Sequence, residues 1–313
     1  VYKMRISTVS MQQQGVNAMM DKQVDLSKTE MQLATGRKVL RPSDNPVNSA
    51  MIVNLKESIA MSEQHLRNAD MANASLAFEE STLSGVNDNI QRARELMIQG
   101  LNDTNSPESR KAIAMELEQI REAIFNLGNT RDEKGEYVFA GTASPTAPGP
   151  FKSVDPQNEA VTFDGNDAQR QIQLGIGQRT VIRDSGVDIF GDLNSGAGDD
   201  IFSTLGNMVE WLNPADPANP QVSSADGLLG NLDAGLDRIH SVQSKIGARM
   251  NMIERNSDVE RGFMDKMKES LSAVNDIDYA ETISQFNIEQ IGMQAAQQAY
   301  TKIQGMSLFD YIR

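Results

Sequence analysis

The sequence contains no cysteine and few aromatic or histidine residues. Its 313 residues include no Cys, one Trp and two His, and aromatic residues make up 5% of the chain. The absence of cysteine excludes disulfides, thiolate metal sites and thiol nucleophiles. We therefore expect a fold that is held together by side-chain packing alone. We also expect no cofactor and no metal.

The chain also lacks an excess of basic residues and any long apolar run. It has 43 acidic and 29 basic side chains, and its formal net charge is −14. Proteins that bind nucleic acid or anionic membranes normally have the opposite balance, so neither partner is expected. No apolar run approaches the roughly 20 residues that a membrane-spanning helix needs. The first residues have no apolar core of the kind found in an ordinary secretory signal.

Proline is confined to a few places along the chain. The ten prolines leave three clean stretches: the residues before 42, residues 47–106 and the residues after 220. Proline breaks helix interiors, so these stretches are where long helices can run. Ser106 before Pro107 indicates a capped helix start, because proline is tolerated at the first helical position.

Heptad spacing predicts two long helices and one shorter helix in these stretches. Apolar residues recur at steps of three and four over about 50 residues, which predicts a helix of about 75 Å. A similar pattern covers residues 225–277, and a shorter one follows Pro107. Seven-residue spacing on the first of these helices links Leu76, Leu83, Ile90 and Met97.

Each end of the chain has a shorter line of regularly spaced apolar residues, here called a seam, that is interrupted by glutamine and small residues. Residues 5–34 and 279–306 each predict a helix of roughly 40–45 Å. Such helices are marginal without a packing partner, so we expect both ends to be mobile in the monomer and ordered by assembly with other copies. The residues predicted to form this assembly interface are Val16, Met19, Leu26, Leu33, Ile283, Phe286, Ile291, Ala295, Ala299, Ile303 and Met306.

The middle of the chain differs in composition. Residues 142–199 are rich in Gly, Pro and Asp, and they contain short alternating runs typical of β-strands. Asp164-Gly165, between two of these runs, predicts a hairpin turn. The expected fold is mainly α, a long antiparallel helical bundle or coiled-coil rod with a small inserted β-rich domain. The predicted domains are a terminal coiled-coil assembly domain (1–41 plus 278–313), a helical rod (42–141 plus 191–277) and a β insert (142–190).

The segment between the first two predicted helices resembles a known family. Residues 35–46 read TGRKVLRPSDNP and are similar to the TG(R/K)xVxxPSDDP segment of the flagellar hook-associated protein 3 family, within the flagellin superfamily. Residues 4–8, 135–141 and 304–309 also resemble that family, whereas residues 278–281 are closer to flagellin. The motif residues are Thr35, Gly36, Arg37, Pro42, Ser43, Asp44 and Pro46.

This resemblance implies a structural protein of the bacterial flagellum. It implies secretion through the flagellar type III channel without signal cleavage, and self-assembly as a homo-oligomer between hook-associated protein 1 and flagellin. It also implies that a cytoplasmic export chaperone holds the C-terminal helix before export. Two alternatives remain, a flagellin that forms the filament itself and a cytoplasmic helical signalling hairpin of the chemoreceptor type.

Other polar residues indicate no catalytic or metal site. His65 and His240 lie far apart on predicted helices, and a metal or catalytic site needs converging partners. Asp199-Asp200 in a Gly-rich stretch reads as a solvated loop. The basic trio of Arg37, Lys38 and Arg41 is either a solvated turn or an intersubunit contact. We therefore expect a protein that is not an enzyme.

Overall fold

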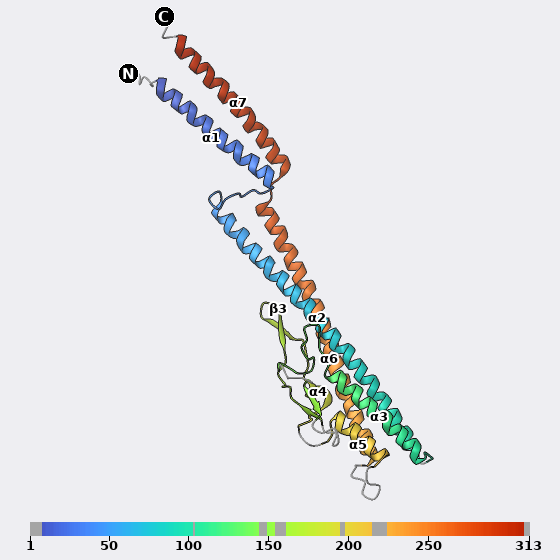
Figure 1. The fold of residues 1–313 in the computed structure, drawn as a ribbon. Helices are drawn as coiled ribbons and strands as arrows, with labels where there is room; N and C mark the ends of the chain where they lie inside the picture. The colour runs from blue at the N-terminus through green and yellow to red at the C-terminus, as the bar shows by residue number, and fades with distance from the viewer. Residues whose placement is uncertain are drawn as a thin grey trace. The chain divides into compact units, whose positions relative to one another are not determined.

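The computed structural model describes residues 8–102, 104–143, 149–153, 161–194, 198–214 and 224–309. These residues form a mainly α structure with two small antiparallel sheets, which confirms the predicted fold class (Figure 1). The elements in chain order are α1 (Thr8–Thr35), α2 (Pro46–Gly100), α3 (Pro107–Gly128), β1 (Phe151–Ser153), β2 (Val161–Phe163), β3 (Gln171–Gly175), β4 (Gln178–Val181), α4 (Gly186–Phe190), α5 (Ile201–Leu212), α6 (Ala225–Asn275) and α7 (Tyr279–Phe309).

The helices predicted from proline spacing and heptads are confirmed. Helix α2 begins at Pro46 and runs for 55 residues, and α6 runs for 51 residues. Leu76, Leu83, Ile90 and Met97, the predicted heptad positions, are all fully buried. Helix α3 begins with Pro107, and the side chain of Ser106 accepts a hydrogen bond from the Ser109 backbone N–H, as predicted.

The contacts divide the chain into two compact units. Residues 1–61 and 262–313 form the first unit, and residues 62–261 form the second. Within the second unit, α2 and α6 run antiparallel, because His65 pairs with Glu260 and, farther along, Arg94 pairs with Asp233. This division differs from the three domains predicted from the sequence, whose boundaries stay a prediction.

The β-rich segment of the second unit shares its core with the helices. The ring centroid of Phe151 lies 4.9 Å from that of Phe190, 5.3 Å from that of Phe163 and 5.5 Å from that of Phe202, which belongs to α5. Phe151 also packs against α3, where a Cβ on Gly128 would lie 3.0 Å from its ring. These aromatic side chains belong to one cluster with the buried residues of α2, α3 and α6.

The strand pairing differs from the sequence-based prediction. Strand β1 pairs with β2, and β3 pairs with β4 through a turn at Ile176-Gly177. Gly177 has a φ of +76°, which suits glycine at such a turn. The predicted hairpin around Asp164-Gly165 was therefore wrong, because the strands that flank this dipeptide pair with other partners.

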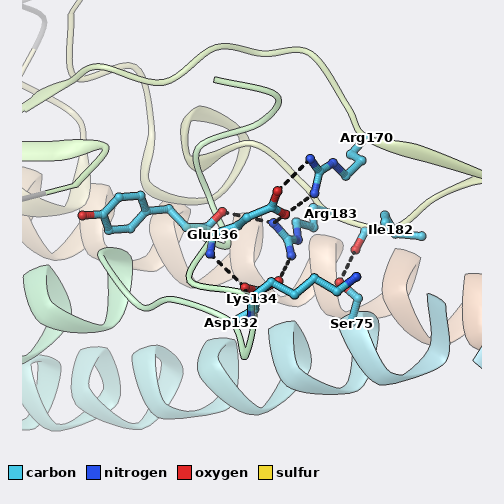
Figure 2. Close-up of polar contacts among 8 residues, drawn as sticks. Ser75, Asp132, Lys134, Glu136, Arg170, Ile182 and Arg183 are labelled. Atoms are coloured by element: carbon cyan, nitrogen blue, oxygen red, sulfur yellow. Dashed lines mark hydrogen bonds and ion pairs between the residues drawn. The ribbon is translucent and has the colours of Figure 1, made fainter. Parts of the chain in front are cut away.

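Charged residues anchor the β-rich segment. Figure 2 shows Arg183, which is 5% exposed, pairing with Asp132 and with Glu136 (3.3 Å), while Arg170 binds Glu136 from the other side (3.0 Å). The hydrogen bond from Arg170 lowers the pKa of Glu136 below its ordinary value. These four side chains hold the loop after α3 against the residues on either side of the β3–β4 pair.

One predicted loop residue has a structural role instead. Asp200 is only 4% exposed, and its side chain accepts a hydrogen bond from the Ser203 backbone N–H (2.9 Å), which caps α5. The prediction that Asp199-Asp200 is a solvated loop was therefore wrong for Asp200. The sequence reading also missed α4 and α5, because both are short.

A further buried acid, Glu79, contacts Asp184, the residue after Arg183. Glu79 of α2 has no exposed surface, and its Oε1 atom accepts a hydrogen bond from the Asp184 backbone N–H (3.0 Å). The Asp184 carboxylate accepts two hydrogen bonds from Arg249 of α6 (2.7 and 2.9 Å). Burial, together with the nearby Asp184 charge, raises the pKa of Glu79 to about 8. The side chain is therefore mostly protonated at neutral pH.

Replacing Glu79 is expected to change how stability depends on pH. The pKa of Glu79 rises from 4.5 to about 8 on folding, so unfolding releases a proton between these values. The free energy of unfolding therefore falls as pH rises through this window. Glu79→Gln keeps the acceptor but cannot ionise, so we expect a flatter profile and a higher Tm than the native chain at the alkaline end. Thermal unfolding across the window measures this, and parallel profiles for the two chains would contradict it.

Removing the central aromatic ring is expected to destabilise helices as well as strands. Phe151→Ala deletes a fully buried ring that contacts elements on both sides of the β-rich segment, at a cost of about 3–5 kcal/mol. Because the core is shared, the helical circular dichroism signal of the second unit should melt at a lower temperature. Phe263→Ala is the control, since this α6 ring is 61% exposed. Unchanged melting of the helices would instead indicate an autonomous insert.

Candidate assembly interface

Helices α1 and α7 form an antiparallel pair in the first unit. Thr29 of α1 donates a hydrogen bond to Glu289 of α7 (2.7 Å), and a Cβ on Gly15 would lie 3.4 Å from the ring of Tyr300. The two helices lie side by side, and the start of α1 and the end of α7 lie at the same end of the pair (Figure 1). The two ends of the chain thus pair with each other.

Five of the predicted interface residues lie on the seam inside this pair. Met19, Leu26 and Leu33 are spaced by seven residues and share a helix face with Thr29. Val16 follows Gly15 on this face, and Phe286 lies one turn before Glu289 on α7. All five are half-buried, whereas Thr29 is 5% exposed. Their role in contacts between copies stays a prediction.

The other predicted residues of α7 lie outside the seam. Ile283 and Ile291 are 49% and 66% exposed, and Ala295 and Ala299 are also exposed. Ile303 and Met306 belong to α7, but their side chains lie outside the described residues. The structure adds residues that the sequence reading missed, and together they define two surfaces. The α7 outer face consists of Ile283, Ile288 and Ile291, and the α1 outer face consists of Met20, Val24 and Met31.

The first half of the family motif ties the α1–α2 connection to the α6–α7 connection. Gly36 has a φ of +69°, and a Cβ there would also lie 3.1 Å from the Tyr279 hydroxyl. The Lys38 N–H donates to the Asn275 carbonyl (2.6 Å), and the Ile277 N–H donates to the Gly36 carbonyl (3.2 Å). Thr35, the last residue of α1, and Arg37, opposite Asp276, complete this stretch.

The pKa of Asp276, which lies in this backbone connection, is lowered by its neighbours. Hydrogen bonds from Ser272 and Asn275 lower the pKa of Asp276, and the nearby Arg37 adds to the effect. Its carboxylate is therefore charged at neutral pH, directly across from a basic residue of the motif.

The second half of the motif forms a tight turn and starts α2. The Asp44 carboxylate accepts a hydrogen bond from the Arg41 N–H (3.1 Å), and the Asp44 N–H donates to the Arg41 carbonyl (3.0 Å). Pro42 and Ser43 are the exposed residues between them, and Pro46 begins the helix. The side chain that caps α2 belongs to Asn45, which accepts from the Asn48 N–H (3.0 Å).

The two histidines lie in ordinary helix contacts. The His65 ring is 3.1 Å from the Glu260 carboxylate, and the His240 ring is 3.1 Å from the Asn87 side-chain oxygen. The described part of the chain holds no group of three or more acidic or histidine residues suited to a metal ion. None of its helices is both long and apolar enough to cross a membrane.

Two family models match the N-terminal and C-terminal parts of the chain. Residues 6–144 match the bacterial flagellin N-terminal helical region, and residues 229–312 match the bacterial flagellin C-terminal helical region. The chain belongs to the flagellin family. This is a family of structural flagellar proteins rather than of enzymes, so the chain is a flagellum-associated protein that assembles with other flagellar components.

Within this family, the chain is similar to hook-associated proteins over nearly its whole length. Flagellar hook-associated protein 3 of Escherichia coli (strain K12) is 28% identical over 320 residues, which cover 98% of this chain and 99% of that protein. Flagellin of Bacillus subtilis (strain 168) is 21% identical over 272 residues, which cover 86% of this chain and 86% of that protein. The resemblance to the hook-associated protein 3 family is thus confirmed, and the likeness to flagellin is weaker.

A solved structure shows the same fold. A flagellar hook-associated protein from Vibrio parahaemolyticus superimposes with a TM-score of 0.66 at 20% sequence identity. The match covers 74% of this chain and 100% of that one. At this level of identity the likeness concerns the fold, and it supports the helical arrangement described above.

The thin seam predicts that the α1–α7 pair opens readily in the monomer. Among residues whose exposure is described, Thr29 is the one buried side chain of the two helices, whereas α2 has a continuous buried seam. Amide hydrogens of α1 and α7 should therefore exchange much faster than those of residues 76–97. Hydrogen exchange on dilute protein measures this. Equal protection of the two regions, at concentrations where the protein is monomeric, would contradict it.

Proposed function

We propose that this chain is a non-enzymatic structural subunit that assembles at the junction between the flagellar hook and filament. In this role it is an adaptor between hook-associated protein 1 and flagellin. The observation that carries the proposal is the exposed apolar surface of the terminal pair, since Ile288 and Ile291 are 61% and 66% exposed. Exposed apolar surface of this kind on a soluble domain marks a contact surface. The near full-length similarity to hook-associated protein 3 supports the location.

The proposal includes a homo-oligomer outside the cell. Export through the flagellar channel precedes assembly, and a cytoplasmic chaperone covers α7 until then. The half-exposed seam between α1 and α7 supports this order of events, because a chaperone can replace the weak partner α1 without unfolding a complete core. The three domains predicted from the sequence, with residues 142–190 as the β insert, belong to the same proposal.

Flagellin remains the second candidate, since the match to the Bacillus subtilis protein covers 86% of both chains. A filament subunit would be distributed along the whole filament, whereas a junction protein would be confined to its base. Immunogold labelling of intact cells distinguishes the two. The cytoplasmic signalling hairpin is no longer a candidate, because the chain belongs to a flagellar family.

Charging the exposed face of α7 is expected to abolish assembly while sparing the monomer. Ile291→Asp with Ala295→Asp places two carboxylates on a surface that is wet in the monomer and covered in the assembly. An unpaired buried carboxylate costs roughly 3–5 kcal/mol, and the penalty recurs in every subunit. We expect unchanged thermal unfolding of the monomer, normal amounts of exported protein in the medium, and no filaments in a strain that lacks the native protein.

The matched control introduces the same charges elsewhere. Ser244→Asp with Ala248→Asp uses the same four-residue spacing on an exposed part of α6 in the second unit. These cells should grow normal filaments. Normal filaments on cells that export the Ile291/Ala295 variant would refute the role of α7 in assembly.

A further inference from the structure

Each helix of the terminal pair has a second apolar face turned away from the seam. Val24 follows the seam residue Met19 by five positions, and Ile291 follows the seam residue Phe286 by five positions. At about 100° per residue, each lies about 140° around its helix from the seam. The α1 outer face and the α7 outer face therefore lie on opposite sides of the pair.

The α1 outer face lines a groove. The groove has a volume of about 560 Å³, and its apolar lining joins Met20, Val24 and Met31 to Leu40 of the following turn. This volume is ample for several aliphatic side chains. A helix that enters such a groove does so with residues of one face, and Ile288 and Ile291 of α7 are spaced by three residues, as this mode requires.

Charge on the groove is complementary to charge on α7. Lys28 and Arg41 line the groove against one acid, Asp44. Within the described residues, neither Lys28 nor Arg41 has an ion-pair partner. The chain has no Lys or Arg from residue 269 to 301, and Glu281 is exposed near the start of α7. In a chain with a net charge of −14, a basic groove offsets the repulsion between copies.

The two outer faces also lie level with each other along the pair. Thr29 is bonded to Glu289, and Gly15 lies against Tyr300, so residues 15–29 and 289–300 run side by side. Val24 and Ile291 both fall within this stretch. Two copies placed side by side without a shift along the helices therefore bring Ile291 of one copy opposite Val24 of the other.

We propose that the groove of one copy receives the α7 outer face of a second copy of this chain. This proposal rests on the proposed self-assembly and assigns its two contact surfaces. Each copy offers its groove to one neighbour and its α7 to another, so the contact is heterologous and repeats around a ring or along a helix. A symmetric contact between two grooves would instead bring Lys28 and Arg41 of both copies together, and like charges oppose it.

Cysteine cross-linking tests the assignment cleanly, because the native chain contains no cysteine. Val24→Cys and Ile291→Cys chains are co-expressed in a strain that lacks the native protein, and sheared flagella are mildly oxidised. A disulfide forms only when the two Cα atoms come within about 7 Å. We expect a linked pair of the 34.4 kDa chains from the mixture and none from either variant alone. Mass spectrometry of the band identifies the joined peptides. Met31→Cys with Ile288→Cys is the second pair.

The controls separate this proposal from the proposed function. Val24→Cys with Ala248→Cys, an exposed α6 position, should give no linked pair. Flagella that contain the variants but give only Val24–Val24 links, or no link with either pair, would overturn the assigned surfaces and leave self-assembly standing. Absence of the native chain itself from sheared flagella would overturn the proposed function.

Discussion

A pair of helices can bury only one face of each helix. The two units of the chain differ in whether further elements cover the remaining faces. In residues 62–261, α2 and α6 pair antiparallel, and α3, α5 and the β-rich segment contribute to the same core. Leu83 and Ile90 are therefore fully buried. In the terminal pair, α1 and α7 pack on each other, and Thr29 is the one buried side chain among their residues whose exposure is described. Apolar residues on their second faces consequently remain on the surface.

Two sets of ion pairs hold the β-rich segment, one formed by Arg183 and the other by the next residue, Asp184. Arg183 turns toward Asp132 and Glu136 of the loop after α3, while Asp184 turns toward Arg249 of α6. Adjacent residues of extended backbone point in opposite directions, so one step of chain can engage two surfaces. Because Asp184 is buried, loss of Arg249 would leave its charge uncompensated, and the arrangement fixes the position of the segment.

The long helices can be predicted from the sequence, whereas the tertiary partners of the short segments cannot. Proline spacing and heptads locate α2, α3 and α6 because dozens of residues repeat one signal. The strands are three to five residues long, so a turn dipeptide such as Asp164-Gly165 outweighs them although their true partners are set by packing around Phe151.

The candidate interface shows the same limit. Heptad spacing finds the seam through Met19, Leu26 and Leu33, since a seam repeats every seven residues. It misses Val24 and Ile288, because a second face is visible only once the first has a known partner. The spacing of Met20, Val24 and Met31, at four and seven residues, is the signal that could have revealed it. The buried pairing of Glu79 with Asp184 joins residues far apart in sequence and has no local signal.

The backbone tie between residues 36–38 and 275–277 has a mechanical consequence. Each of the two chain segments that leave the α1–α7 pair is bonded to the other through main-chain N–H and C=O groups. A pull or twist applied to either terminal helix is therefore shared between both segments instead of stretching one alone. Main-chain groups are the same whatever side chains occupy most of these positions, so the coupling tolerates substitution except at Gly36, whose positive φ favours glycine. Proline at Lys38 or Ile277 would remove a donor from it.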